Sequence, residues 1–443
     1  MPGLSGLCLL LVAGSFVHAQ PGGPFPSIPP LPSGEGPLPK VLDQYPDSPS
    51  LSPTFTIPVG PLGFSVPGEN YLLRHQSLVS LDFIGEDRIL FTFRVPRLMQ
   101  RDAADNSDDK KQQIQALVLS LPTGKIESRA TWTVPDRSRY LWMLSDGHFL
   151  LRVADGLDEG DAELQMKPNL RVPGRLLWIE MDPGQQIMIT NSLEPANASQ
   201  KPGGQSLSEP KSPATEPAAA TTDAQKPDGQ SVLLARTQKL ATGEVIRESR
   251  VPWTNQNSDW PMNSEGYLEN SRDRADQWLL KLNSFSGGSQ VLTHLESTCP
   301  PTYNFVSESE LLLMTCDPDS GWTLRAMSTR GDSLWEARTA LNAMSPLLVT
   351  ASNGLRVARE TMLLKRSVDK YKRMVGTRDF QGQTVKVFNA ADGKMVLESP
   401  LTPIFDGGGN VAISPTGQRV AILNAGAIQV FQLPAPTAVP GSH

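Results

Sequence analysis

The sequence predicts an all-β fold in which a four-stranded antiparallel unit repeats about seven times. Three observations support this prediction. The 39 prolines and 36 glycines among 443 residues leave little room for long helices. Short apolar stretches alternate with turn residues along most of the chain, and no apolar period of helix length interrupts them. The architecture that such repeats favour is a seven-bladed β-propeller, in which each unit is one blade.

The first repeated feature is a hairpin of two short apolar strands joined by a tight turn. Its weakest copy is the fourth. The seven copies have their strands at 79–83 and 89–95, 140–144 and 149–153, 177–181 and 187–190, 260–263 and 267–270, 303–306 and 311–315, 347–350 and 355–358, and 410–414 and 419–423.

A second hairpin alternates with the first. Its turns contain pairs such as Thr123-Gly124 and Asp392-Gly393, which supply the positive φ that a tight hairpin needs. Two hairpins together make a blade of four strands. The second hairpin is visible at 116–120 and 126–130, 232–235 and 245–248, 278–282 and 291–295, 324–327 and 334–337, and 385–388 and 395–398.

The last unit shows only three strands, of which the third is 427–433. Residues 54–59 alternate between apolar and polar side chains, so they can supply the fourth strand from the N-terminal side. We therefore predict that this N-terminal strand closes the last blade, because closure leaves fewer strand edges exposed.

Two motifs resemble a known family. The segment 414–419 (SPTGQR), followed by an apolar strand, is similar to the Ser-Pro-Asp-Gly turn of WD40-like and YVTN-like bacterial β-propellers. The segment 385–394 (VKVFNAADGK) resembles the outer hairpin of the same blades, whereas the Trp-Asp dipeptide of true WD40 repeats is absent. The resemblance covers about 71–433. It implies a propeller from a family with many functions, mostly ligand or protein binding.

The ends of the chain and one internal stretch differ in composition from the repeats. An apolar run at 7–17 followed by Val-His-Ala predicts a signal peptide at 1–19, cleaved after Ala19, although no Lys or Arg precedes the run. A hydrophobic tail without a targeting role is the alternative. We expect a Pro/Gly-rich disordered leader at 20–53, the propeller at 54–434 with a disordered loop insertion at 194–230, and a disordered tail at 435–443.

These features predict an exported protein, periplasmic or secreted. No apolar stretch is long enough to cross a membrane once the signal is removed, and the net charge of −6 argues against binding to nucleic acid. Export also favours a disulfide between Cys299 and Cys316, because the hairpin at 303–315 places both near one end. Two unpaired core cysteines are the alternative.

Long connections are predicted at one position of the blade. If strands A to D count outward from the axis, the B–C and D–A connections share one face. The long B–C connections fall at 96–113, 154–163, 191–230 and 365–381. Binding residues concentrate on loops held by a rigid scaffold, although insertions also collect where they are tolerated. One connection is strongly basic and is a candidate contact for an anionic ligand or partner, or else a solvated loop: Lys365, Arg366, Lys370, Lys372, Arg373 and Arg378.

The remaining residues are weaker candidates for a metal, ligand or catalytic site. The acids Asp155, Asp158, Glu159 and Asp161 lack EF-hand spacing, as do Asp317 and Asp319, so we expect no metal there. Trp142 and Trp178 fall on predicted innermost strands, where packing between blades is the usual role. No nucleophile elbow, phosphate-binding loop or Cys-x-x-Cys pair is present, so we predict no catalytic residues and no cofactor.

The leading hypothesis is an exported, non-enzymatic binding or scaffold propeller that engages a protein or a surface polymer through its B–C loop face. We expect a monomer. One alternative is a hydrolase or lyase with an active site in an axial pocket. Another is a redox propeller that binds a quinone.

Overall fold

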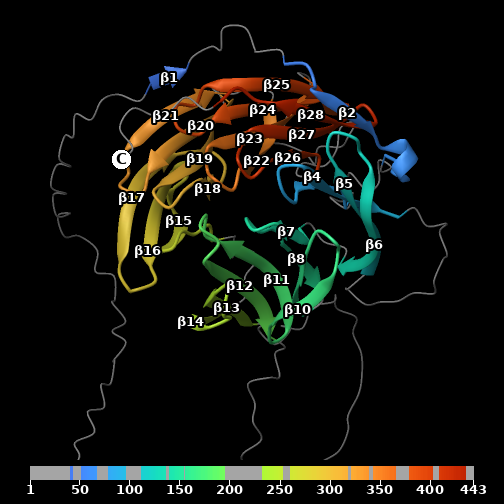
Figure 1. Ribbon diagram of the computed structural model, residues 1–443. Coiled ribbons are helices and arrows are strands. Elements are labelled where there is room, and N and C mark those ends of the chain that lie inside the picture. The colour runs from blue at the N-terminus through green and yellow to red at the C-terminus, as the bar shows by residue number, and fades with distance from the viewer. Residues whose placement is uncertain are drawn as a thin grey trace, which may run out of the picture. The chain divides into compact units, whose positions relative to one another are not determined.

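The computed structural model describes residues 40–42, 51–66, 78–95, 111–135, 139–153, 155–194, 232–252, 260–317, 321–338, 343–365, 379–402 and 409–435. All of them belong to one compact unit, Pro39–His443. They form seven sheets that follow one another around a central axis (Figure 1), so the fold is the predicted seven-bladed β-propeller. Within the described residues, no helix is long and apolar enough to cross a membrane.

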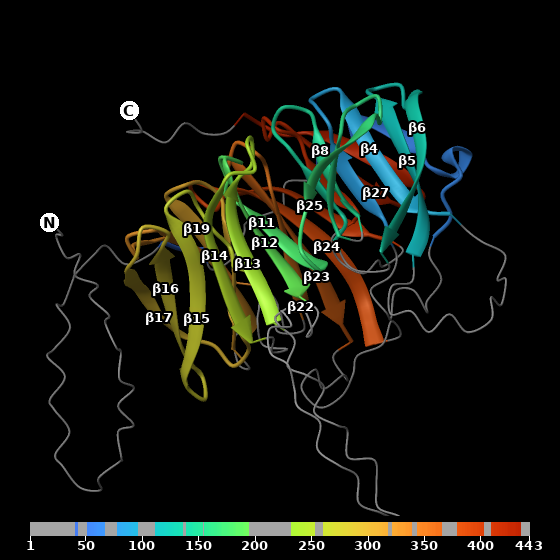
Figure 2. The same cartoon turned by 90° about the horizontal axis from the view of Figure 1, so that it is seen from below.

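The blade strands are antiparallel, and in blades 1 to 6 they lie in chain order from the axis outward (Figures 1 and 2). In blade 7 the outermost strand, β2, comes from the N-terminal side. Blade 1 contains β3 (Ser80–Phe83), β4 (Arg88–Arg94), β5 (Lys111–Ser120) and β6 (Ile126–Pro135), and blade 2 contains β7 (Leu141–Met143), β8 (Phe149–Val153), β9 (Gly156–Gly160) and β10 (Met166–Arg171). Blade 3 contains β11 (Arg175–Met181), β12 (Ile187–Glu194), β13 (Val232–Lys239) and β14 (Val245–Pro252), and blade 4 contains β15 (Gly266–Arg274), β16 (Gln277–Ser284) and β17 (Ser289–Glu296). Blade 5 contains β18 (Thr302–Phe305), β19 (Glu310–Asp317), β20 (Gly321–Ser328) and β21 (Ser333–Arg338). Blade 6 contains β22 (Ala343–Thr350), β23 (Arg356–Leu364), β24 (Phe380–Asn389) and β25 (Met395–Leu401), and blade 7 contains β26 (Val411–Ile413), β27 (Arg419–Asn424), β28 (Ala427–Gln432) and β2 (Phe55–Pro58).

The N-terminal strand closes the last blade, as predicted. β2 pairs antiparallel with β28 in a register that places Phe55 opposite Val430 and Pro58 opposite Ala427. A second short strand, β1 (Lys40–Leu42), lies inside the predicted leader and pairs parallel with β21 of blade 5.

Blade 2 corrects one prediction. The segment 154–163 is not a long B–C connection, because half of it is strand β9, which pairs with both β8 and β10. The close approach of β10 explains the glycine at the start of this strand: a Cβ on Gly156 would lie 2.0 Å from the carbonyl oxygen of Leu170. The remaining long B–C connections follow β4, β12 and β23, and their residues at 96–110, 195–231 and 366–378 lie outside the described part of the chain.

Blade 4 departs from the four-stranded plan. Its sheet has three described strands, and the predicted innermost strand at 260–263 is reduced to one bridge between Met262 and Tyr267. Proline contributes to this interruption, because Pro261 has no N–H to donate to a neighbouring strand.

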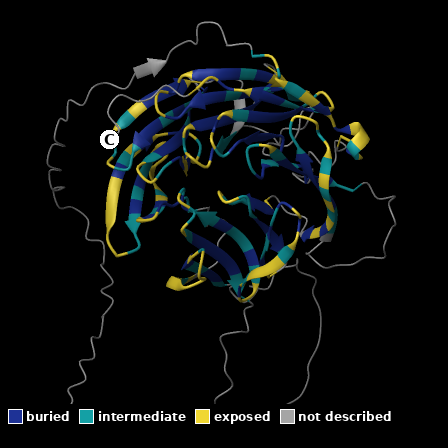
Figure 3. Cartoon of the chain, viewed as in Figure 1, coloured by how far each residue is buried: buried dark blue, intermediate teal, exposed yellow. Residues whose placement is uncertain are grey.

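Buried apolar residues cluster between most neighbouring blades, and Figure 3 shows how much of the blade strands is buried. Clusters of buried residues join blades 7 and 1, 1 and 2, 2 and 3, 4 and 5, 5 and 6, and 6 and 7. The cluster between blades 7 and 1 includes the rings of Phe64, Phe91 and Phe93, whose centroids lie 5.0–5.5 Å apart. Among the described residues, no apolar cluster joins blades 3 and 4.

Candidate ligand-binding cavity at blade 4

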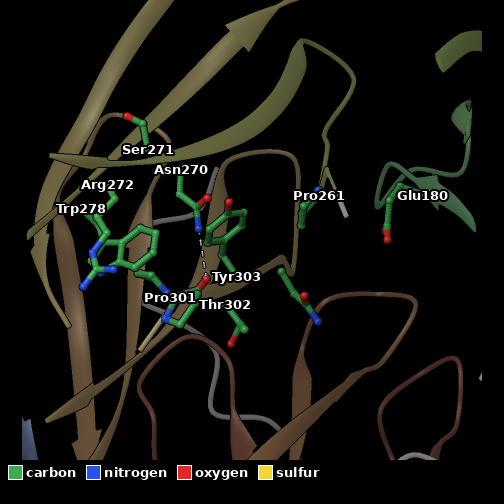
Figure 4. A pocket seen from close by; sticks show the side chains of 11 residues that line it. Glu180, Pro261, Asn270, Ser271, Arg272, Trp278, Pro301, Thr302 and Tyr303 are labelled. Atoms are coloured by element: carbon green, nitrogen blue, oxygen red, sulfur yellow. Dashed lines mark hydrogen bonds between the residues drawn. The ribbon is translucent and has the colours of Figure 1, made fainter. Parts of the chain in front are cut away.

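A cavity of about 710 Å³ lies beside blade 4 and is bounded by residues of blades 3, 4 and 5 (Figure 4). This volume is within the range of about 300–1,000 Å³ that ligand sites occupy. Its walls combine amides, hydroxyls, aromatic rings and prolines, with one carboxylate and one guanidinium. The lining residues are Glu180, Pro261, Asn270, Ser271, Arg272, Trp278, Pro300, Pro301, Thr302, Tyr303 and Asn304.

The cavity lies along the inner edge of β15, where the other blades carry an innermost strand. Among the described residues, this edge is paired at its beginning: the Leu268 N–H donates to the carbonyl of Pro261 at 2.8 Å, and the Gly266 carbonyl accepts the Asn263 N–H at 3.0 Å. Peptide groups of an antiparallel strand point alternately to its two sides. Asn270 and Arg272 therefore direct their N–H and carbonyl groups to the same edge as Leu268, and no described strand pairs with that edge there.

The wall formed by blade 4 is held in place by its own contacts. The guanidinium carbon of Arg272 lies 5.6 Å from the centroid of the Trp278 ring, in a cation–π arrangement. The Arg272 Nε donates to the carbonyl of Ala275 at 2.8 Å, and the Trp278 Nε1 donates to the carbonyl of Ser297 at 2.9 Å. Fixed partners of this kind give the cavity a defined surface before any ligand binds.

The wall formed by blade 5 is anchored by a disulfide between Cys299 and Cys316, whose Cα atoms are 5.8 Å apart. The Ser297 hydroxyl donates to the Cys299 carbonyl at 2.7 Å and accepts the Cys316 N–H at 3.0 Å. Asn270 crosses from blade 4, and its side-chain amide donates to the carbonyl of Pro301 at 3.4 Å. These bonds fix the segment Pro300–Thr302 at the rim of the cavity.

The described lining of the cavity is poor in acid–base groups. Glu180 is the one carboxylate in its described lining, and that lining contains no histidine and no thiol. A glycoside-cleaving or lyase-type site ordinarily brings two or more acid–base groups together at the reacting bond. The groups present instead offer hydrogen bonds and flat apolar surfaces to a ligand.

A carboxylate links the three blades around the cavity through their A–B turns. Glu308, between β18 and β19, accepts hydrogen bonds from the Ser264 N–H at 2.8 Å, the Ser264 hydroxyl at 2.6 Å and the Gly184 N–H at 3.2 Å. Burial raises the pKa of Glu308, but the bonds from Ser264 and Gly184 outweigh it and hold that pKa below its usual range.

Asp182, in the same turn as Gly184, lies beside this carboxylate. Its Oδ1 accepts the Gln186 N–H at 2.8 Å and the Ile187 N–H at 2.6 Å. Burial raises the pKa of Asp182 above its usual range, and the negative charge of Glu308 adds to that effect.

Of the basic residues singled out in the sequence, the structure describes Lys365, which is not among the described residues that line the cavity. Lys365 is described, and its N–H donates to the carbonyl of Asp379 at 2.9 Å. The other five members of the basic loop lie outside the described residues: Arg366, Lys370, Lys372, Arg373 and Arg378.

The acidic residues of blade 2 have partners within their own sheet. Arg171 contacts Asp158 at 2.6 Å and Asp155 at 3.8 Å, and Lys167 contacts Glu159 at 2.9 Å. The remaining acid, Asp161, accepts the Gln165 N–H at 2.9 Å and so caps a turn.

The other residues named above occupy separate places. Asp317 ends β19 opposite Gly321, and Asp319 lies outside the described residues. Trp142 is 4% exposed and packs in the apolar cluster between blades 2 and 3, and Trp178 is partly buried on β11. The cavity residues carried no sequence signal beyond the weak fourth hairpin and the Pro300-Pro301 pair.

The comparisons with known proteins find only low similarity. No family model and no curated protein matches the sequence. The uncomplexed acylaminoacyl peptidase of Pyrococcus horikoshii matches in structure with 10% identity over 83% of this chain and 52% of that chain, with a TM-score of 0.48. TolB from Acinetobacter baumannii matches with 12% identity over 74% and 78% of the two chains and a TM-score of 0.37. An oligogalacturonate lyase in complex with manganese matches with 11% identity over 81% and 97% and a TM-score of 0.38. The chain spans about half the length of the peptidase.

Proposed function

We propose that this chain is an exported, non-enzymatic binding propeller that holds a segment of a partner protein or envelope polymer in the cavity at blade 4. The observation that carries the proposal is the composition of the cavity. Its walls present peptide groups, amides, hydroxyls and the Trp278 ring, whereas the described lining holds only one carboxylate.

The position of the cavity supports the same proposal. Arg272 lies near the end of β15, Trp278 near the start of β16, and Thr302 at the start of β18. In the propeller these strand ends face the side on which the B–C and D–A connections lie. The strands β4, β12 and β23, which precede the long B–C connections, end on that side as well.

The hydrolase or lyase alternative has less support. Asp82 on β3 is an acid on an innermost strand. Burial raises its pKa, while a hydrogen bond from the Ser80 hydroxyl and the charge of Arg139 lower it. However, Asp82 belongs to blade 1 and is not among the residues that line the cavity with Glu180.

A cavity-filling substitution tests the proposal. Purified protein is screened on peptide and glycan arrays as wild type, as Thr302→Trp and as Gln290→Trp, a matched control on exposed β17. We expect ligands that bind the wild type and the control but bind Thr302→Trp about ten-fold more weakly or worse, because the indole occupies the cavity. Equal binding to all three proteins, or no ligand at all, would contradict the proposal.

A further inference from the structure

We propose that Asp182 and Glu308 share a single proton, and that this proton holds the A–B turns of blades 3, 4 and 5 together. Loss of the proton as pH rises leaves two negative charges that face each other and loosens the contact between the three turns. This carboxyl pair is a property of the fold, and its action does not require that the cavity bind a ligand.

The two carboxyl groups converge at Gly184, in the turn between β11 and β12. A Cβ at Gly184 would lie 3.1 Å from Asp182 Oδ2 and 3.4 Å from Glu308 Oε1, so both oxygens approach the same point. Asp182 Oδ1 accepts the N–H groups of Gln186 and Ile187, whereas Oδ2 is buried and accepts no hydrogen bond from an N–H or O–H group. The polar group that Oδ2 meets is the side chain of Glu308.

A hydrogen bond between two carboxyl groups needs a proton on one of them, because ionised carboxylates only accept. Asp182 is 2% exposed, whereas Glu308 lies at the surface and accepts bonds from Ser264 and Gly184. Burial penalises a negative charge on Asp182 more strongly, so the proton resides on Asp182 and Glu308 carries the charge. The raised pKa of Asp182 and the lowered pKa of Glu308 agree with this assignment.

A metal ion in place of the proton suits these groups less well. Calcium takes about six to eight oxygen ligands. The groups directed at Glu308 are instead two backbone N–H groups and the Ser264 hydroxyl, which present their positive ends to the carboxylate. A proton on Asp182 adds one more donor to this set.

The turns packed around the carboxyl pair carry other charges. Two ion pairs, Asp146 with His148 at 3.0 Å and Lys239 with Glu244 at 2.7 Å, are held within the turns of blades 2 and 3. The turns of blades 4 and 5 contain Glu265, Glu310, Arg330 and Asp332. The charge that acts on Asp182 is that of Glu308, so the two acids titrate chiefly through each other.

The carboxyl pair adjoins all three walls of the cavity. Glu180 and Pro261 line the cavity and lie close in sequence to Asp182 and Ser264, and β18 leads directly into the turn that contains Glu308. Blade 4 is also tied to this turn by Asn263, whose side-chain amide donates to the Glu308 carbonyl at 2.9 Å. A separation of the turns therefore moves the walls of the cavity relative to one another.

Carboxyl 13C NMR of the full chain tests whether the proton is shared. Signals are followed across pH in the wild type, in Glu308→Gln and in Asp182→Asn, which assigns the Asp182 signal by its loss. We expect Glu308→Gln to raise the acid dissociation constant of Asp182 about ten-fold or more, because the negative neighbour is gone and the new amide donates to the carboxylate. Asp87→Asn, in the β3–β4 turn with its side chain 79% exposed, is the control and should leave the Asp182 titration unchanged.

Three results would overturn the sharing of a proton. The first is an equal pKa of Asp182 in the wild type and in Glu308→Gln. The second is a shift of the wild-type Asp182 signal when calcium chloride is added at constant pH, which would show a bridging cation. If Glu308→Gln does not fold, the wild type decides: both signals must move in two steps at common pH values, and independent single steps are the third such result.

Hydrogen exchange tests whether the proton holds the turns together. Protection of the Gly184 and Ser264 amides, corrected for the pH dependence of intrinsic exchange, is measured in the wild type and in Asp182→Asn. We expect wild-type protection to fall about ten-fold as pH rises through the pKa of Asp182, and to stay within about three-fold in Asp182→Asn, whose amide donates to Glu308 at every pH. Protection that falls equally in both proteins, or in neither, would overturn this role of the proton.

Discussion

The interface between blades 7 and 1 differs sharply from the interface between blades 3 and 4. At the first, β2 completes the last sheet, and the rings of Phe64, Phe91 and Phe93 pack among buried aliphatic side chains. At the second, the described residues form no apolar cluster, and the turns are joined through the carboxylate of Glu308. Apolar packing thus holds together the first and last blades, which close the ring. The polar interface borders blade 4, beside which the cavity lies.

The largest expected effect lies at the apolar interface. Phe91→Ala removes a ring that is 0% exposed and contacts two others, so we expect a loss of about 3–5 kcal/mol in the free energy of unfolding. Urea denaturation measures it. Val66→Ala, at a position 46% exposed, is the control and should change stability by less than about 0.5 kcal/mol. If Phe91→Ala loses as little stability as the control, this cluster does not hold blades 7 and 1 of the propeller together.

The disulfide at the rim of the cavity should have the next largest effect. It links residues 17 apart in the sequence, and the loop-closure relation gives about 3 kcal/mol for a loop of this size. We expect the intact protein to gain two hydrogen masses on reduction and to lose stability by roughly that amount. An unchanged mass under reductant would show that Cys299 and Cys316 are not bonded.

The polar interface should contribute less. Glu308→Ala removes the acceptor of three hydrogen bonds that come from blades 3 and 4, and we expect a loss of about 1–3 kcal/mol. Glu308→Gln keeps one oxygen acceptor and should lose less than the alanine variant. Thermal unfolding measures the stability of both variants and of the wild type. If the wild type and Glu308→Ala unfold at the same temperature, Glu308 does not stabilise the interface between these blades.

The smallest expected effect concerns pH. The folded-state pKa of Asp182 is raised, so its contribution to stability is fully present below its unfolded pKa and declines as pH rises through the folded pKa. Asp182→Asn keeps the acceptor oxygen for Gln186 and Ile187 but cannot ionise. We therefore expect the variant to gain stability relative to wild type between about pH 4 and pH 8. The lowered pKa of Glu308 acts in the opposite direction, with stability lost as pH falls through it. Because Asp182 and Glu308 affect each other's pKa, the difference between the two proteins reports on the pair.

The sequence predicted the features that local patterns specify. Hairpins with Gly-containing turns and the alternation in 54–59 identified the blades and the closing strand, because tight turns and strand alternation depend on neighbours in sequence. The strand β9 was missed because its acids resembled a loop, whereas in the sheet they pair with Arg171 and Lys167 of the adjacent strand. Export and the role of the basic loop stay predictions.

The cavity could not be predicted for a different reason. Its lining comes from Glu180, Pro261, the 270–278 hairpin and the 300–304 segment, which the ring brings together from three blades. None of these residue types is unusual alone. Within the described residues, the innermost strand of blade 4 is reduced to a bridge at Met262, and the cavity lies beside it. A shortened pairing of this kind depends on tertiary structure, and the sequence showed it only as the weakest of seven hairpins.

The most direct test of the central claim is deuterium exchange of the whole chain with and without a ligand selected on the wild-type protein. The account predicts new protection in β15 and in the 300–304 segment, with no change at β2 and β28, where blades 7 and 1 meet. Protection confined to other blades, with blade 4 unchanged, would contradict it.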